Sequence, residues 1–152
     1  MLCLALAPAV AGAETLRMII QSPPEGGGKC VDVPNAQFLW GMRIQMWDCN
    51  NTIAQTFTYD TQNQTLKIGD KCVEVWGKGD SGDNVGLGVC NGGMAQQWRM
   101  VAKNDNYQIV GMNNQCLGIR GGASKERGTP LDITPNCNAG PWRVWQLVEA
   151  PH

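Results

Sequence analysis

Cysteine is the residue whose spacing in this 152-residue chain most clearly indicates a chemical reaction, the formation of disulfide bonds. Six of the seven cysteines recur as three pairs, and within each pair the second follows the first after about twenty residues. An even number of cysteines is what a disulfide framework in an oxidising compartment requires. Six cysteines can combine in many ways, but the repeated spacing selects three bridges: Cys30–Cys49, Cys72–Cys90 and Cys116–Cys137.

Side chains for other kinds of chemistry are scarce. The only histidine is His152, and the sequence contains neither a Cys-x-x-Cys pair nor a Gly-x-Ser-x-Gly elbow. These absences argue against a metal site and against acid–base or nucleophilic catalysis. A glycosidase needs two carboxylates about 5–10 Å apart, and Asp32 and Asp48 are the nearest candidates. We therefore expect no metal, no cofactor and no enzymatic activity, and a glycosidase is the enzymatic alternative.

Residues 1–13 are typical of a secretory signal peptide. Leu2 to Val10 form an apolar run that is too short to span a bilayer, and Ala11-Gly12-Ala13 has the small-x-small form of a cleavage site. Cleavage would remove Cys3 and leave the six paired cysteines. The formal net charge is −1 with no block of like charge, so we expect no nucleic-acid partner and no membrane span. The mature protein, residues 14–152, is expected to be secreted or periplasmic.

The segments of sequence around these cysteines repeat with the same spacing as the cysteines themselves. The first cysteines of the three pairs lie 42 and 44 residues apart, and each unit closes with a triplet similar to Gln-x-Trp. The triplets are Gln55-Thr56-Phe57, Gln96-Gln97-Trp98 and Arg143-Val144-Trp145. A period of about this length indicates that one supersecondary unit has been copied. We expect three repeats, at about residues 15–60, 61–102 and 103–149, within a single domain.

Each repeat is predicted to contain four short strands, because apolar and polar residues alternate between glycine-rich turns. The expected ranges are 17–20, 30–33, 43–47, 55–59, 65–69, 72–75, 85–90, 96–100, 107–112, 116–119, 130–134 and 143–148. Twelve strands with threefold internal symmetry predict an all-β fold, a closed β-trefoil whose sheet has no exposed edge.

The closing triplets should help to hold the three repeats together. Phe57, Trp98 and Trp145 occupy equivalent places and are expected to meet in the core. Gln55 and Gln96 are expected to bond to backbone groups of the adjoining turns. The third copy has Arg143 in place of Gln, and because its charge is harder to bury, we expect that turn to be built differently.

Three motifs recur in register: a Cys-x-Asp-Val strand (Cys30–Val33), a Gln-x-Trp-x-Cys-Asn segment (Gln45–Asn50) and the closing triplet. Together they resemble the ricin B-type (R-type) lectins and the related family 13 carbohydrate-binding modules. The likeness covers about residues 15–149. The resemblance implies a β-trefoil with one shallow sugar site per repeat and no catalytic activity in the domain itself.

The resemblance also implies which residues would bind a sugar in the first repeat: Asp32, Gln45, Trp47 and Asn50, while Ala54 departs from the family pattern. A carboxylate can accept bonds from two neighbouring hydroxyls, and bonds to a charged acceptor contribute roughly 1.5–3 kcal/mol each. An indole offers a flat face to the C–H patch of a pyranose. Gln45 and Asn50 can both donate and accept, which would distinguish axial from equatorial hydroxyls. Each of these residues could instead be purely structural.

The other two repeats keep less of the pattern. The second has Glu74, Trp76 and Asn91 as a weaker site, with Gly86 and Gly88 at the Gln and Trp positions. The third has Gly118 where the acid should be, so its site is expected to be lost. An apolar cluster of Phe38, Leu39 and Trp40 either packs over the barrel or walls the sugar site.

The function that follows is that of a secreted, non-catalytic carbohydrate-binding lectin domain with its main site in the first repeat. Galactose- and xylose-type glycans are the expected ligands, and one weak site would gain avidity within a larger toxin or hydrolase complex. The alternative is a protein-binding β-trefoil, either an inhibitor or an interaction subunit of a toxin or other complex, because fold alone does not fix function.

Overall fold

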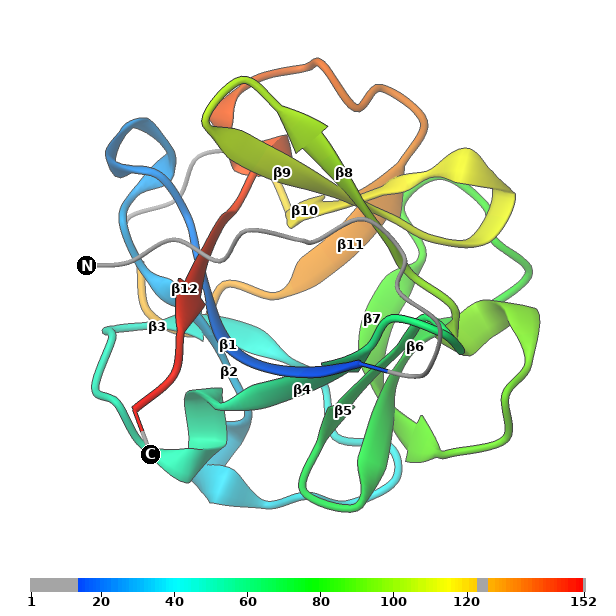
Figure 1. Cartoon of the computed structure of the whole chain (residues 1–152). Coiled ribbons are helices and arrows are strands. Elements are labelled where there is room, and N and C mark those ends of the chain that lie inside the picture. The colour runs from blue at the N-terminus through cyan, green and yellow to red at the C-terminus, as the bar shows by residue number, and fades with distance from the viewer. Residues whose placement is uncertain (1–13, 123–125, 152) are drawn as a thin grey trace.

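The computed structural model describes residues 14–122 and 126–151. The expected signal peptide, residues 1–13, lies outside these ranges. Within them the backbone forms twelve β-strands and six short 3-10 helices (Figure 1). Over the same residues, no helix is long and apolar enough to cross a membrane.

The strands fall into three successive groups of four. The first group is β1 (Thr15–Gln21), β2 (Cys30–Asp32), β3 (Gln45–Trp47) and β4 (Phe57–Asp60). The second is β5 (Thr65–Ile68), β6 (Lys71–Trp76), β7 (Asn84–Val89) and β8 (Arg99–Lys103). The third is β9 (Asn106–Val110), β10 (Cys116–Ile119), β11 (Leu131–Thr134) and β12 (Gln146–Glu149). The 3-10 helices are η1 (Pro24–Gly26), η2 (Pro34–Ala36), η3 (Ile53–Gln55), η4 (Met94–Gln96), η5 (Met112–Asn114) and η6 (Pro141–Arg143).

Six of these strands close into a ring. Strand β1 pairs with both β12 and β4, β4 pairs with β5, and β8 pairs with β9, all antiparallel. Two isolated bridges complete the circuit, Thr65↔Gln97 beside β8 and Tyr107↔Trp145 beside β12. The remaining strands form the hairpins β2–β3, β6–β7 and β10–β11. This threefold arrangement is the predicted β-trefoil.

Each hairpin loop attaches to the next hairpin through a glycine bulge. The Gly41 amide donates to the Leu87 carbonyl (2.9 Å), and the Leu87 amide donates to the Met42 carbonyl (2.8 Å). Two loop residues, Gly41 and Met42, therefore pair with the single strand residue Leu87, which is the pattern of a β-bulge. The same pattern recurs in the other two loops, with the glycine and partner pairs Gly82–Ile133 and Gly128–Met46. The three glycines have φ values of 86°, 90° and 85°, which side chains with a Cβ rarely adopt. The bulges therefore place each loop in the same way beside the following repeat.

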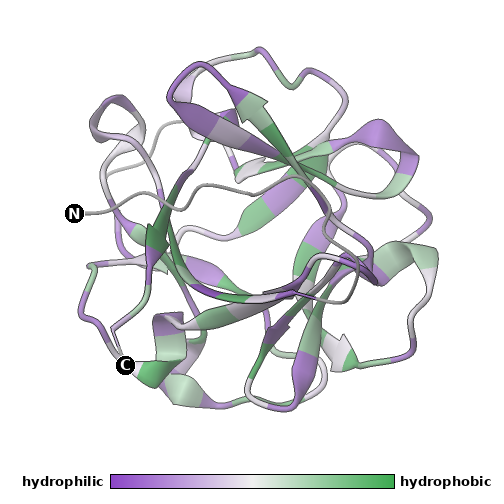
Figure 2. Cartoon of the chain, in the orientation of Figure 1, coloured by the Kyte–Doolittle hydropathy of each residue, from purple (hydrophilic) through white to green (hydrophobic). Residues whose placement is uncertain are grey.

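The core lies where inward-facing side chains of the three repeats meet. Phe57, Trp98 and Trp145 are all 0% exposed and belong to one apolar cluster, as predicted. Figure 2 shows the alternation of hydrophobic and hydrophilic residues along the strands that supply this cluster. The indole nitrogens of Trp98 and Trp145 donate to the carbonyls of Val73 (2.9 Å) and Leu117 (3.1 Å). Each of these two indoles thereby ties the closing triplet to the second strand of its own repeat.

All three predicted disulfides are confirmed. Each joins the first or second residue of a repeat's second strand to a cysteine one to three residues beyond its third strand, with Cα–Cα distances of 5.1, 5.0 and 5.3 Å. No bridge joins two repeats among the residues that the structure describes. The three repeats are therefore cross-linked internally and held to one another by non-covalent contacts.

The prediction that the closing strands begin at Gln55, Gln96 and Arg143 is wrong. These residues end the 3-10 helices η3, η4 and η6, and the strands begin later. The cause is the side chain of the triplet's first residue. The Gln55 amide donates to the Asp48 carbonyl (2.9 Å) and accepts from the Asn50 backbone amide (3.0 Å), which holds a turn rather than a strand. These two bonds to the adjoining turn are the ones that the sequence predicts for Gln55.

Candidate functional site

The predicted acid of the first repeat lies in a cluster of three polar side chains. Asp32 ends β2, directly opposite Gln45 of β3, and is only 4% exposed. Its Oδ1 accepts a hydrogen bond from Gln45 Nε2 (2.9 Å), and its Oδ2 accepts one from Gln55 Nε2 (3.0 Å). Each carboxylate oxygen has a second lone pair to offer. The cluster therefore contains Gln55 as well, for which the sequence predicts only bonds to the backbone.

Trp47 lies at the other end of β3, where it is half-buried beneath a side chain from the third repeat. The Arg127 guanidinium lies 5.7 Å from the centre of the indole ring, at cation–π distance. Arg127 also donates to Asp48 Oδ2 through Nε (2.8 Å), and Lys29 donates to Asp48 Oδ1 (3.2 Å). The sequence gives no signal for Arg127 because it is 79 residues away from Asp48.

Asp48 is held as a carboxylate by its two cationic neighbours. Its pKa is lowered, first by the hydrogen bond from Lys29 and then by the bond from Arg127. A general acid needs a raised pKa so that it still carries a proton near neutral pH. Asp48 therefore does not supply the protonated partner that the glycosidase alternative would require beside Asp32.

Asn50 and Asn91 both support turns. The Asn50 side-chain oxygen accepts from the amide (3.2 Å) and the hydroxyl (2.7 Å) of Thr52. The Asn91 side-chain oxygen accepts from the Gly93 amide (2.8 Å). Both side chains are exposed, and neither amide nitrogen bonds to the part of the chain that the structure describes. Asn50, whose oxygen already accepts two bonds, can still offer a donor to a ligand, whereas Asn91 can offer both a donor and one acceptor lone pair.

The second repeat places its acid and its indole side by side on β6. Glu74 and Trp76 lie two residues apart and face the same side of the hairpin. The Glu74 carboxylate lies across Gly88 and the Trp76 ring lies across Gly86, so that a Cβ at either glycine would collide with them. Glu74 accepts one long hydrogen bond, from Gln96 Nε2 (3.4 Å). The indole of this hairpin therefore lies on β6 rather than on β7.

The third repeat has a similar polar cluster, but its acid lies on the third strand instead of the second, and an arginine takes the place of the closing glutamine. Gly118 replaces the acid, and the space that a side chain would occupy there is filled by Arg143. The carboxylate instead comes from Asp132, which lies opposite Gly118 in the position of Gln45. Arg143 and Asp132 form an ion pair (2.8 Å) whose side chains are 6% and 7% exposed. This carboxylate is enclosed, and the turn is built differently, as the sequence predicts.

The apolar cluster of the first hairpin loop divides into two parts. Phe38 packs against Gly69 and the core. Leu39 and Trp40 are 57% and 73% exposed, and the Gly41 bulge attaches their loop to β7 of the second repeat. One of the two predicted alternatives therefore holds for Phe38. Leu39 and Trp40 keep most of their side-chain surface exposed.

Comparison with known families identifies the repeated arrangement. A family model described as the ricin-type beta-trefoil lectin domain matches residues 18–145. This chain belongs to that family. Lectin domains of this family are generally non-catalytic.

Solved structures share the fold of this lectin domain at low sequence identity. A designed threefold-symmetric protein, ThreeFoil, is 23% identical with a TM-score of 0.78, over 88% of this chain and 98% of that one. The C-terminal half of an earthworm R-type lectin, in complex with GalNAc, is 16% identical with a TM-score of 0.70, over 88% and 98% of the two chains. A curated relative, serine protease 1 of Rarobacter faecitabidus, is 42% identical over 45 residues, which are 30% of this chain and 8% of the protease.

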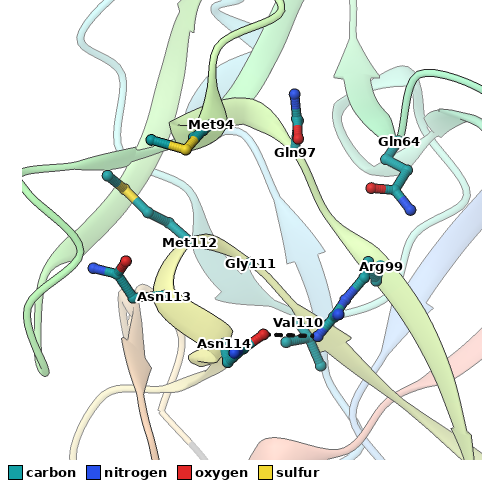
Figure 3. A pocket seen from close by; sticks show the side chains of 9 residues that line it. All are labelled: Gln64, Met94, Gln97, Arg99, Val110, Gly111, Met112, Asn113 and Asn114. Carbon is teal, nitrogen blue, oxygen red and sulfur yellow. Dashed lines mark hydrogen bonds between the residues drawn. The ribbon is translucent and has the colours of Figure 1, made fainter.

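A separate hollow of about 240 Å³ lies between η4 and η5 of the lectin domain (Figure 3). It is lined by Gln64, Met94, Gln97, Arg99, Val110, Gly111, Met112, Asn113 and Asn114. The Arg99 guanidinium donates to Asn114 Oδ1 (3.1 Å). None of these lining residues is a carboxylate or an aromatic ring, so the hollow lacks the pair of groups found in the first two repeats. Among the described residues, no cluster of three or more potential metal ligands occurs.

Proposed function

We propose that this chain is a secreted, non-catalytic carbohydrate-binding lectin domain with its main sugar site at Asp32, Gln45, Trp47 and Asn50. The observation that supports this most strongly is the first-repeat cluster. Paired strands place Asp32 opposite Gln45 and Trp47 opposite Cys30, so that an acid, an amide and an indole share one hairpin. This combination matches the mixed polar and apolar surface of a pyranose ring.

The hydrogen bonds within the cluster suggest how the groups would share the sugar. Gln45 Nε2 is engaged by Asp32, which leaves the Gln45 Oε1 atom to accept from a hydroxyl. Asp32 itself presents only the edge of its carboxylate, because it is 4% exposed. Trp47 would contact the C–H patch with whichever part of its ring Arg127 leaves uncovered. A site this small is expected to bind a monosaccharide with a dissociation constant in the millimolar to high micromolar range.

The proposal that the chain has no catalytic role is supported by Asp48. Its low pKa, caused by Lys29 and Arg127, deprives Asp32 of a protonated partner for glycoside hydrolysis. Secretion is supported by three disulfides, which persist in oxidising compartments. Galactose- or xylose-type glycans are the proposed ligands, and the GalNAc complex of the earthworm lectin favours testing the galactose type first.

Weak binding by one domain would become useful by clustering or by attachment to a larger protein. The matching stretch in a serine protease supports attachment to a hydrolase, because that stretch is 8% of the protease and the rest must perform other work. We therefore propose that the domain targets a toxin or hydrolase partner to glycan surfaces.

The test is NMR observation of the indole N–H groups of the six tryptophans during titration with galactose, GalNAc and xylose. The Trp47 signal should shift, whereas Trp98 and Trp145 are 0% exposed and serve as internal controls. Trp47→Ala should remove the strongest binding measured by calorimetry. Val101→Ala, a substitution of an exposed β8 residue, should leave it unchanged.

Asp32→Asn keeps the shape of the side chain but replaces one of the two acceptor oxygens with an amide donor, so the Gln45 amide must turn its oxygen toward residue 32 to keep that hydrogen bond. Denaturation of the variant is therefore measured beside its binding. The variant should fold and bind more weakly by roughly tenfold or more. If no indole signal moves with any of the three sugars, while the protein is oxidised and folded, the proposed function is wrong.

A further inference from the structure

The end of the hairpin loop in the third repeat, just before β11, borders the first-repeat cluster. The Gly128 amide donates to a carbonyl of β3 (2.8 Å), and Pro130 forms a bridge with Gln45. Gly128 also lies beside the acceptor end of Gln45, because a Cβ built on this glycine would be 3.8 Å from Gln45 Oε1. Arg127, the residue before it, places its guanidinium 5.7 Å from the centre of the Trp47 ring. One border of the cluster therefore comes from another repeat.

A salt bridge holds the Arg127 guanidinium in this place. Its Nη2 atom lies 2.7 Å from Asp48 Oδ2, and its Nε atom donates to the same oxygen (2.8 Å). Lys29 donates to the other oxygen of Asp48 (3.2 Å), which leaves Oδ2 to Arg127. The guanidinium therefore contacts a carboxylate and an indole that are neighbours in the first repeat.

A sugar and this guanidinium need the same surface of Trp47. A pyranose would lay its apolar C–H patch on the face of the indole, and a cation at this distance from an aromatic ring is attracted to that face as well. Trp47 is half-buried, so the ring surface open to a ligand is already limited, and Arg127 covers part of it. The indole is therefore the part of the proposed site that Arg127 obstructs.

The obstruction is one that a ligand can remove at modest cost. The two side chains of the salt bridge are well exposed, 62% for Arg127 and 47% for Asp48. Exposed ion pairs contribute little to stability, and an exposed cation–π contact is also weak. Asp48 would keep Lys29 as a counter-charge after Arg127 had moved. The bond from Gly128 to β3 is made by the backbone, so the loop can stay in place while this side chain turns away.

We propose that Arg127 competes with the sugar for Trp47 and so sets the affinity of the first-repeat site from the third repeat. This inference rests on the proposed lectin function and adds regulation to it. In the unliganded protein the guanidinium covers part of the indole, and full stacking of a sugar requires this side chain to turn away. Salt screens the exposed Arg127–Asp48 pair, so the obstruction weakens as the ionic strength rises.

The experiment compares the oxidised wild type with Arg127→Ala. Galactose, GalNAc and xylose are titrated by calorimetry and by following the indole N–H signal of Trp47. The sugar that binds the wild type most tightly should bind Arg127→Ala about three- to tenfold more tightly, because it no longer displaces the cation. Asp48→Asn keeps the guanidinium but weakens its salt bridge, and it should raise the affinity by a smaller factor.

Arg99→Ala is the matched control. It removes another exposed arginine, one that donates to Asn114 instead of covering Trp47, and should leave the affinity within about twofold. Urea denaturation should give Arg127→Ala nearly the midpoint of the wild type, because the lost ion pair is exposed.

A salt series tests the obstruction directly. Raising sodium chloride from about 0.05 M to about 1 M should tighten sugar binding to the wild type and leave binding to Arg127→Ala constant. The difference is expected because only the wild type has a salt bridge that holds a cation against Trp47. A purely structural role of Arg127 would not produce this salt dependence.

The outcomes separate this inference from the function on which it rests. If Arg127→Ala bound sugar as tightly as the wild type, the competition would be overturned. Weaker binding by Arg127→Ala would overturn it too, because it would indicate that the guanidinium bonds to the sugar. In both cases a shift of the Trp47 signal would leave the lectin function standing. No shift of that signal in either protein, with any of the three sugars, would overturn both.

Discussion

At the scale of single residues, the first and third repeats each bury a carboxylate, but they pair it with different side chains. In the first, Asp32 on β2 accepts bonds from the amides of Gln45 and Gln55. In the third, the acid has moved to Asp132 on β11, and Arg143 occupies the space left by Gly118. The first arrangement leaves a half-buried amide at the surface, whereas the second encloses both charges. Because Asp32 and Asp132 are almost equally buried (4% and 5% exposed), the two repeats differ in the partner of the acid, a neutral amide in the first and a buried cation in the third.

Removing one partner of the enclosed pair should be strongly destabilising. Asp132→Asn would leave the Arg143 guanidinium buried without a counter-charge, and its Nε atom already has no partner among the described residues. We expect a loss of about 3–5 kcal/mol in the free energy of unfolding, measured by urea denaturation. The double variant with Arg143→Gln should lose less than Asp132→Asn alone. Asp70→Asn, in an exposed ion pair, should leave the denaturation midpoint unchanged.

Ionisation of Tyr59 should lower the stability of the fold at alkaline pH. Its hydroxyl donates to the Trp98 carbonyl (2.7 Å), and burial followed by the charge of Asp60 raises its pKa from 10.0 to about 12. Because the pKa is higher in the folded state, this residue's contribution to stability is complete below pH 10. It is then lost as the pH rises from 10 towards 12.

Tyr59→Phe should therefore cost about 1 kcal/mol near neutral pH, where the hydrogen bond is lost. The gap between the variant and the wild type should close above pH 10, as urea denaturation at increasing pH would show. A gap that stays constant up to pH 12 would contradict the role assigned to this hydroxyl.

At the scale of elements, the glycine bulges decide which repeats meet. They place the loop of each repeat against the third strand of the next, so Arg127 reaches Trp47 and Gly41 bonds to Leu87. Each bulge requires a backbone conformation with positive φ at its glycine. The loops are therefore positioned by backbone geometry rather than by the identity of their exposed side chains.

Gly82 allows this requirement to be tested by itself, because φ is 90° and an added Cβ would meet nothing within 4 Å. Gly82→Ala should cost about 1–2 kcal/mol in the free energy of unfolding, since only backbone strain is introduced. Gly82→Asn should cost less, because Asn tolerates positive φ better than Ala does. Equal losses from the two variants in thermal or urea denaturation would contradict a backbone origin.

The sequence predicts what lies within a repeat better than what lies between repeats. Cysteine spacing and the closing triplets were enough to predict the disulfides and the buried Phe57, Trp98 and Trp145, because these contacts recur at fixed separations. The start of each closing strand was not predicted, since the side-chain bonds of Gln55 end a turn where the apolar pattern indicates a strand. Arg127 acts across repeats, and local periodicity carries no information about such a contact.

At the scale of the whole molecule, covalent cross-links act within each repeat, and non-covalent contacts join one repeat to another. Each disulfide closes a loop within one repeat, with sequence separations of 19, 18 and 21 residues. The repeats are joined by the barrel pairings and the shared apolar core. Each bridge should therefore stabilise the whole fold by a similar amount, while its effect on binding should depend on which repeat it belongs to.

Replacing Cys116 and Cys137 together by Ala should lower the free energy of unfolding by about 2–4 kcal/mol, because the unfolded chain gains freedom. Saccharide affinity should change by no more than about twofold, since the four residues proposed to contact the sugar all lie in the first repeat. The matched replacement of Cys30 and Cys49 should cost similar stability but also weaken binding, because Trp47 lies opposite Cys30 and two residues before Cys49. Denaturation and calorimetry on the same two variants measure both quantities. If the third-repeat variant lost as much affinity as the first-repeat variant, binding would depend on the rigidity of the whole barrel rather than on the local geometry of one hairpin.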